Sequence, residues 1–119
     1  MNELIETLFN NFTVDGEKIP VSLLYYEGKG ETYITYQLVD ESDSYSGDDK
    51  MLGYVEWYDF DIYSKSDYTN IVKAVKKLLS DNDFTYSTER SSGDMYERDT
   101  GYYHRTLCFK TLKGENTNG

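Results

Sequence analysis

One amphipathic segment, residues 67–80, constrains the fold of this chain more than any other feature. Its apolar side chains recur at helical spacing and form one stripe: Tyr68, Ile71, Val72, Val75, Leu78 and Leu79. Lysines take the opposite side of the same segment. A helix with a single apolar stripe needs another layer to cover it. Because an alternating segment precedes this helix and a hairpin pattern follows it, we expect the covering layer to be a β-sheet.

The rest of the chain divides into a short helix and several strands. The spacing of apolar residues between positions 4 and 12 predicts an N-terminal helix. Alternation and turn residues predict strands at 19–26, 31–39, 51–63, 95–98 and 102–110, with 84–89 as a short strand or an extended lead-in. We expect the first two strands to form a hairpin around Gly28 and Gly30, and the last two to form one around Asp99-Thr100-Gly101.

These elements fit one domain, because 119 residues is the usual size of a single domain with a real core. We predict an α+β fold in the order α-β-β-β-α-β-β, with an antiparallel sheet of about four to five strands. The N-terminal helix and the helix at 67–80 would pack on that sheet. The domain is expected to span residues 1–112, and the small polar residues at 113–119 are expected to form a disordered tail.

Residues 40–49 form the sharpest compositional break, with five acids, no base and several serines. We interpret this segment as a solvated loop whose length indicates either mobility or a contact role. Its acids do not follow the EF-hand spacing, and no glutamate occupies the closing position, so no calcium site is expected.

Twenty-two acidic and twelve basic residues give a net charge of −10. Such a field repels a phosphate backbone, so direct nucleic-acid binding is not expected. The charge fits a nucleic-acid mimic, a protein with a basic partner, a surface that faces DNA without holding it, or simple solubility. Thirteen tyrosines fit either strand propensity or a tyrosine-rich contact surface.

Catalytic motifs are weak in this chain. The Asp-Thr-Gly at 99–101 matches the aspartic protease signature, but its flanks suit a solvated turn. The second aspartate that such a protease needs would have to come from another copy of the chain in a homodimer. His104 and Cys108 lie four strand residues apart, roughly 13 Å, which is too far for a thiol–imidazole pair. The acid pair Asp59 and Asp61 is better explained as a charged outer strand face. We therefore expect no catalytic residue, metal or cofactor.

Cys108 is the one cysteine, which excludes an internal disulfide and indicates a reducing compartment. The N-terminus does not have the pattern of a signal peptide. No apolar stretch approaches the roughly 20 residues that a membrane span needs. The candidate contact residues are the acidic segment, the acidic strand face and the hairpin near 99–101: Asp40, Glu41, Asp43, Tyr45, Asp48, Asp49, Asp59, Asp61, Tyr96, Arg98 and Tyr102.

Several pieces of sequence, in their order along the chain, resemble a known family. They are residues 19–21, 32–37, 61–65, the helix end at 76–79, and the run 95–105. Together they resemble the small tail completion, or tail-terminator, proteins of long-tailed bacteriophages and prophages, over roughly residues 1 to 112. The resemblance implies a small α+β domain without enzymatic activity. It also implies a role in capping the finished tail tube and joining it to the head connector.

The family resemblance implies partners as well. They are other copies in a ring, commonly hexameric, together with the tail tube protein and the head connector protein. DNA would pass through such a ring, which would lie at the tail–head interface of the virion after assembly in the bacterial cytoplasm. The main alternative is an acidic DNA mimic or inhibitor that binds a basic partner. A small enzyme and a generic binding module are further alternatives.

Overall fold

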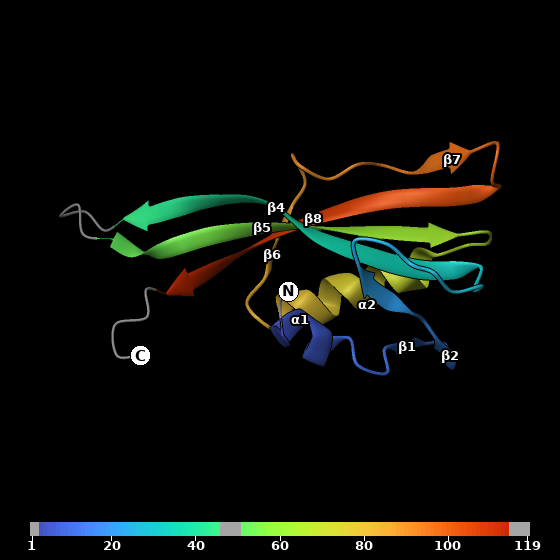
Figure 1. Cartoon of the computed structure of the whole chain (residues 1–119), viewed down its shortest axis with the longest axis horizontal. Coiled ribbons are helices and arrows are strands. Elements are labelled where there is room, and N and C mark those ends of the chain that lie inside the picture. The colour runs from blue at the N-terminus through green and yellow to red at the C-terminus, as the bar shows by residue number, and fades with distance from the viewer. Residues whose placement is uncertain (1–2, 46–50, 115–119) are drawn as a thin grey trace.

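The computed structural model describes residues 3–45 and 51–114, and the fold is α+β, as predicted. Two helices pack on one face of a sheet (Figure 1). The elements in chain order are α1 (Glu3–Leu8), β1 (Thr13–Val14), β2 (Glu17–Lys18), β3 (Val21–Leu23), β4 (Thr32–Tyr45), β5 (Met51–Ser64), α2 (Thr69–Ser80), β6 (Thr85–Ser87), β7 (Met95–Glu97) and β8 (Tyr102–Gly114).

The main sheet is larger than predicted and is mixed. It has six strands in the order β3-β4-β5-β8-β6, and β7 also pairs with β8. β1 and β2 form a separate hairpin, whose Asp15 and Gly16 have φ of 53° and 81°. These positive angles fit the Asp-Gly type I′ turn that joins tightly paired strands. The expected antiparallel sheet of four to five strands is therefore wrong in size, and it is wrong in direction at one strand.

That strand is β3, which pairs with β4 in parallel and not as a hairpin. Between them the chain turns back over the sheet, and Tyr26 stacks on Tyr33 with 4.6 Å between ring centroids. The backbone N–H of Gly30 donates to the Tyr26 hydroxyl at 3.1 Å. A Cβ at Gly28 would lie 2.1 Å from that hydroxyl. The two glycines thus make room for a tyrosine ring, which is why their spacing does not mark a two-strand turn.

The core lies between α1, α2 and the sheet face that we call the helix face. Phe60 on β5 is fully buried, and its ring contacts Phe9, Tyr36 and Phe109 with centroids 5.6 to 5.8 Å apart. The predicted alternation of β5 is confirmed, because Tyr58, Phe60 and Ile62 are all buried in this core. The other sheet face, which we call the open face, carries the intervening residues.

The acidic segment at 40–49 is a strand where the structure describes it, and the predicted loop is wrong there. β4 continues through Asp40 to Tyr45 and pairs with β5 along its length, with a register shift between Leu38 and Asp40. β5 in turn pairs with β8 as far as Gly114. Strand preference depends strongly on context. Here β5 and β8 have high β propensity, and pairing with β5 keeps the low-propensity residues 40–44 of β4 in the strand.

The ends of two predicted elements also differ. α2 begins at Thr69, two residues after the predicted start, because the Asp67 side chain accepts hydrogen bonds from the backbone N–H and the hydroxyl of Thr69. β8 extends two residues beyond the predicted domain end, so Lys113 and Gly114 belong to the sheet and not to a tail. The β7–β8 hairpin is confirmed, with Gly101 at φ 77° in its turn.

The molecule is elongated. Its extents are 51 × 27 × 23 Å and its radius of gyration is 15.8 Å, against roughly 13.5 Å for a compact chain of this length. Figure 1 shows the cause: the tips of β4, β5 and β8 run on past both helices. We call these tips, residues 38–45, 51–57 and 110–114, the arm, and the remaining described residues the body.

Candidate functional site

The arm exposes both charged and apolar side chains. Asp40, Glu41 and Asp43 are exposed along β4. Leu38 and Leu112 are 48% and 56% exposed, and they come from the two outer strands of the arm. Neither α1 nor α2 covers this part of the sheet (Figure 1). Apolar side chains in such positions are available for contacts with another protein.

A charged and aromatic cluster lies where the arm joins the body on the open face. The Arg90 guanidinium lies 3.8 Å from the Trp57 ring centroid, and its Nη1 is 3.1 Å from Oδ2 of Asp40. The Lys110 ammonium approaches the same indole from the next strand at 5.5 Å. The pKa of Asp40 lies below its usual value because the Glu41 backbone N–H and Arg90 both donate to its carboxylate. This cluster ties the base of the arm to the chain that follows β6.

An aromatic row crosses the open face at the other end of the sheet. Tyr33 stacks between Tyr26 and Tyr63, and Tyr63 stacks on His104 with ring centroids 4.2 Å apart. Tyr33, Tyr63 and His104 lie side by side because the strand registers align them. The Tyr102 ring meets both Tyr33 and Tyr63 edge-on. Burial in this row raises the pKa of Tyr63 to about 12.

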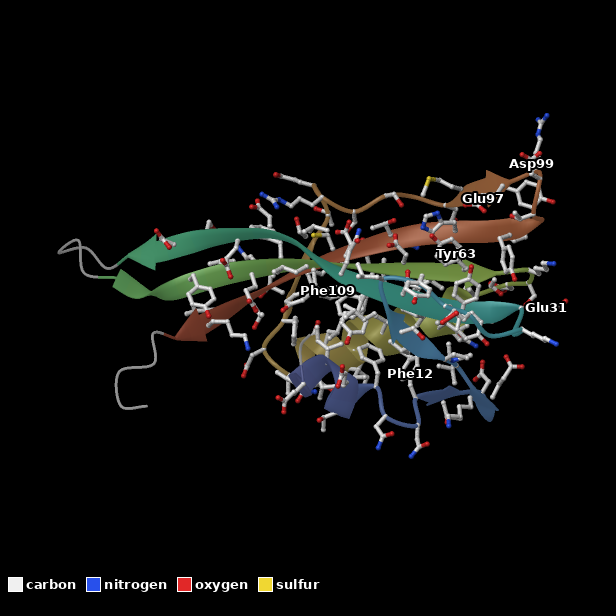
Figure 2. The ribbon with its side chains drawn as sticks, viewed as in Figure 1. Phe12, Glu31, Tyr63, Glu97, Asp99 and Phe109 are labelled. Carbon is white, nitrogen blue, oxygen red and sulfur yellow. The ribbon has the colours of Figure 1, made fainter. Side chains whose placement is uncertain are left out.

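Asp61 lies beside this row and is held by two neighbours. It accepts a hydrogen bond from the Thr106 hydroxyl at 2.5 Å, and His104 Nε2 is 3.1 Å from the same oxygen. Glu97 lies 3.7 Å from His104 Nδ1 on the opposite side of the imidazole. Figure 2 shows Tyr63 and Glu97 together at the end of the molecule that is opposite the tip of the arm. Asp61 thus has a structural role within the sheet.

Asp59 has a different environment from Asp61. Burial raises the pKa of Asp59, and the Cys108 thiol bonds to its carboxylate from β8. Burial and this carboxylate raise the pKa of Cys108 to about 12. Cys108 is buried, at 1% exposure. Because a thiol reacts as its thiolate, Cys108 is in the unreactive form at neutral pH.

The clefts that we find lie elsewhere. One of about 200 Å³ lies between the β1–β2 hairpin and the start of α2, where Thr32 and Ser64 share a hydrogen bond of 3.0 Å. Another, of about 450 Å³, lies beside the start of α2. Neither is lined by Asp59 or Asp61. Among residues 3–45 and 51–114, no three His, Cys, Asp or Glu side chains are grouped so that they could hold a metal ion.

The structure divides the sequence-predicted contact residues into three groups. Asp40, Glu41, Asp43 and Tyr45 lie on β4 in the arm, whereas Asp48 and Asp49 lie outside the described residues. Asp59 and Asp61 share the open face of β5 with their β8 neighbours. Tyr96, Arg98 and Tyr102 belong to the β7–β8 hairpin at the far end of the sheet, where Tyr96 packs against Tyr103. The candidates therefore do not form one site.

Sequence reasoning missed the residues that organise these surfaces. Arg90 and Trp57 lie 33 positions apart in the chain, and the turn after β6 together with the pairing of β6, β8 and β5 brings them together. The row of Tyr33, Tyr63 and His104 likewise depends on the registers of three strands. The abundance of tyrosine was the one available signal, and it does not say which rings stack.

Comparisons with known proteins do not identify a family. A scan against protein-family models finds no match to this chain. A search of curated proteins finds no matching relative. In the described part of the chain, both helices fall short of the length and apolar character that a membrane span requires.

Proposed function

We propose that this protein is a structural subunit of a bacteriophage or prophage that caps the finished tail tube and joins it to the head connector. The order of its sequence pieces, which resembles the small tail completion proteins, supports this role. The observation that carries the proposal is the arm, which extends past both helices and leaves apolar side chains and strand edges exposed. Such edges are suited to contacts with neighbouring subunits.

In this role, copies of the chain form a ring, commonly hexameric in the family that the sequence resembles, between the tail tube protein and the connector protein. The ring lies at the tail–head interface of the virion after assembly in the host cytoplasm. A net charge of −10 suits a ring that surrounds DNA, because negative side chains let a phosphate backbone pass without retaining it. Substitution of acidic residues by lysine on such a surface would slow DNA passage.

The alternative, an acidic DNA mimic, is favoured by the exposed acids of β4. Two of its candidate acids are already engaged within the chain, however. Asp40 pairs with Arg90, and Asp61 bonds to Thr106 beside His104. A mimic needs acids that remain available to a basic partner. It would bind a basic nucleic-acid-binding protein with strong salt dependence, whereas a junction protein would co-purify with tail tubes or connectors.

Removal of the gene from the phage that encodes it tests the proposed function. We expect electron micrographs of the lysate to contain separate heads and tails, with tubes of abnormal length. Supplying the wild-type gene in trans should restore joined particles. Normal joined virions in the absence of the protein would contradict the role. The neighbouring genes give an independent check, because portal, capsid, connector and tail tube genes are expected beside this one.

A further inference from the structure

The arm has two open edges among the residues that the structure describes. On one edge, β3 reaches β4 only as far as Tyr36, so the following residues of β4 have β5 as their strand partner. On the other edge, β6 reaches β8 only as far as Lys110, so residues 111–114 have β5 as their strand partner. The Thr111 hydroxyl donates to the Asp83 carbonyl, so the exposed part of this edge begins at Leu112. The outward backbone groups of such edges can form hydrogen bonds to another strand.

These two edges carry opposite charges at the same level of the arm. Asp43 on β4 and Lys113 on β8 both pair with Tyr54, so they lie in one row on either side of β5. Glu41 and Thr111 flank Glu56 in the same way, two residues along. Residues two apart in a strand point to the same face, so Glu41 and Asp43 project on the side where Lys113 also projects.

We propose that a second copy of this chain docks on the arm, with the β8 edge of one copy against the β4 edge of the next. β4 and β8 run in the same direction because each is antiparallel to β5. In the arrangement that we propose, the helices of both copies lie on the same side of the joined sheet, so the new strand pair is parallel. Residues 41–44 of one copy then meet residues 111–114 of the other. Neighbouring strands lie about 4.8 Å apart, which places Lys113 within reach of Asp43 and Glu41 of its neighbour.

Charge also selects against the two symmetric arrangements. Pairing β4 with β4 would bring Glu41 and Asp43 close to the same two acids of the second copy, and pairing β8 with β8 would bring the two Lys113 side chains close together. Like charges directly opposite each other destabilise a strand pair. The contact is therefore head-to-tail, the kind that closes into a ring when the rotation per subunit permits.

One exposed apolar side chain of the arm fits the same arrangement. Leu112 is 56% exposed on the β8 edge, within the segment that would pair. It would lose solvent contact beside a neighbouring copy, which stabilises the pair through burial of apolar area. This inference rests on the self-association within the proposed function, and not on the partners in the tail or head.

Two charge reversals in the full chain test the contact. Sedimentation velocity over a concentration series would measure self-association of wild type, Asp43→Lys and Lys113→Asp. We expect each single variant to associate about 10-fold more weakly than wild type. Mixed in equal amounts, the two variants should associate again, because every contact then joins an acid to a lysine. The double variant should also associate alone, and added salt should weaken all contacts.

Asp99→Lys and Lys29→Asp are the matched controls, since they make the same charge changes at exposed positions outside the arm. Both should associate as wild type does. A wild-type chain that stays monomeric up to its solubility limit, or single variants that associate normally, would overturn the inference. Failure of the mixture to recover would overturn the head-to-tail geometry. If these contacts hold but loss of the gene leaves virions joined, the proposed function fails while the interface stands.

Discussion

β4, β5 and β8 run through both the body and the arm, and the two regions differ in whether helices cover these strands. In the body, α1 and α2 cover the helix face, and large side chains such as Phe60, Phe109 and Ile62 are fully buried. In the arm, the strands continue without a helix layer, and Leu38, Val39 and Leu112 are exposed. Free energy of folding comes mainly from buried apolar area. The difference therefore assigns stability to the body and leaves the arm for contacts.

The largest expected effect is in the body. Phe60→Ala removes a fully buried ring that packs against Phe9, Tyr36 and Phe109. We expect the free energy of unfolding to fall by about 3–5 kcal/mol, the usual cost of a large core cavity. Urea denaturation followed by circular dichroism measures it. Leu112→Ala in the arm is the matched control and should change stability by less than about 0.5 kcal/mol. Equal losses for the two variants would break the comparison.

A smaller effect is expected at the far end of the body, in the aromatic row. Gly28→Ala would place a methyl group 2.1 Å from the Tyr26 hydroxyl. Tyr26 must then leave its stack on Tyr33, at an expected cost of about 1–2 kcal/mol. Self-association should not change, because this row is remote from the arm.

Gly93→Ala is the control for that substitution, since a Cβ there would have no described atom within 4 Å beyond its own residue and its two chain neighbours. Thermal denaturation compares the two variants. A Gly28→Ala protein as stable as Gly93→Ala would show that the row does not hold the loop between β3 and β4 in place.

The smallest expected effect concerns Asp59, which lies next to the arm. Its folded-state pKa is raised, chiefly by burial, so the folded state holds its proton more tightly than the unfolded state. Stability contributed by this group is therefore present at low pH, and it is lost as pH rises from the unfolded pKa through the folded one. Asp59→Asn should remove that loss and stabilise the protein at neutral pH by up to about 1 kcal/mol.

Unfolding free energies of wild type and Asp59→Asn between acidic and neutral pH measure this difference. The two curves should converge in acid and separate as pH rises. A variant that is less stable than wild type at neutral pH would mean that the carboxylate bond to Cys108 outweighs the cost of burial.

The sequence predicts the body better than the arm, for a physical reason. The apolar stripe of α2 and the alternation of β5 are local patterns, and so is the turn glycine at 101. The direction of β3 is decided by Tyr26, whose ring stacks on Tyr33 across the chain reversal. The arm depends on β5 and β8, which continue the strand pairing alongside the acidic residues of β4. Neither the Tyr26 stack nor that strand pairing appears as a local pattern. The same limit hides the cluster of Arg90 and Trp57, which depends on strand register.

Hydrogen–deuterium exchange of the full chain tests most directly whether the arm is the contact element. Wild type at a concentration where it associates would be compared with monomeric Lys113→Asp at the same concentration. We expect association to slow exchange at amides within residues 41–44 and 111–114, while exchange in α1, α2 and β5 of the body stays unchanged. Slowed exchange confined to the helices, or no difference in the arm, would contradict this account.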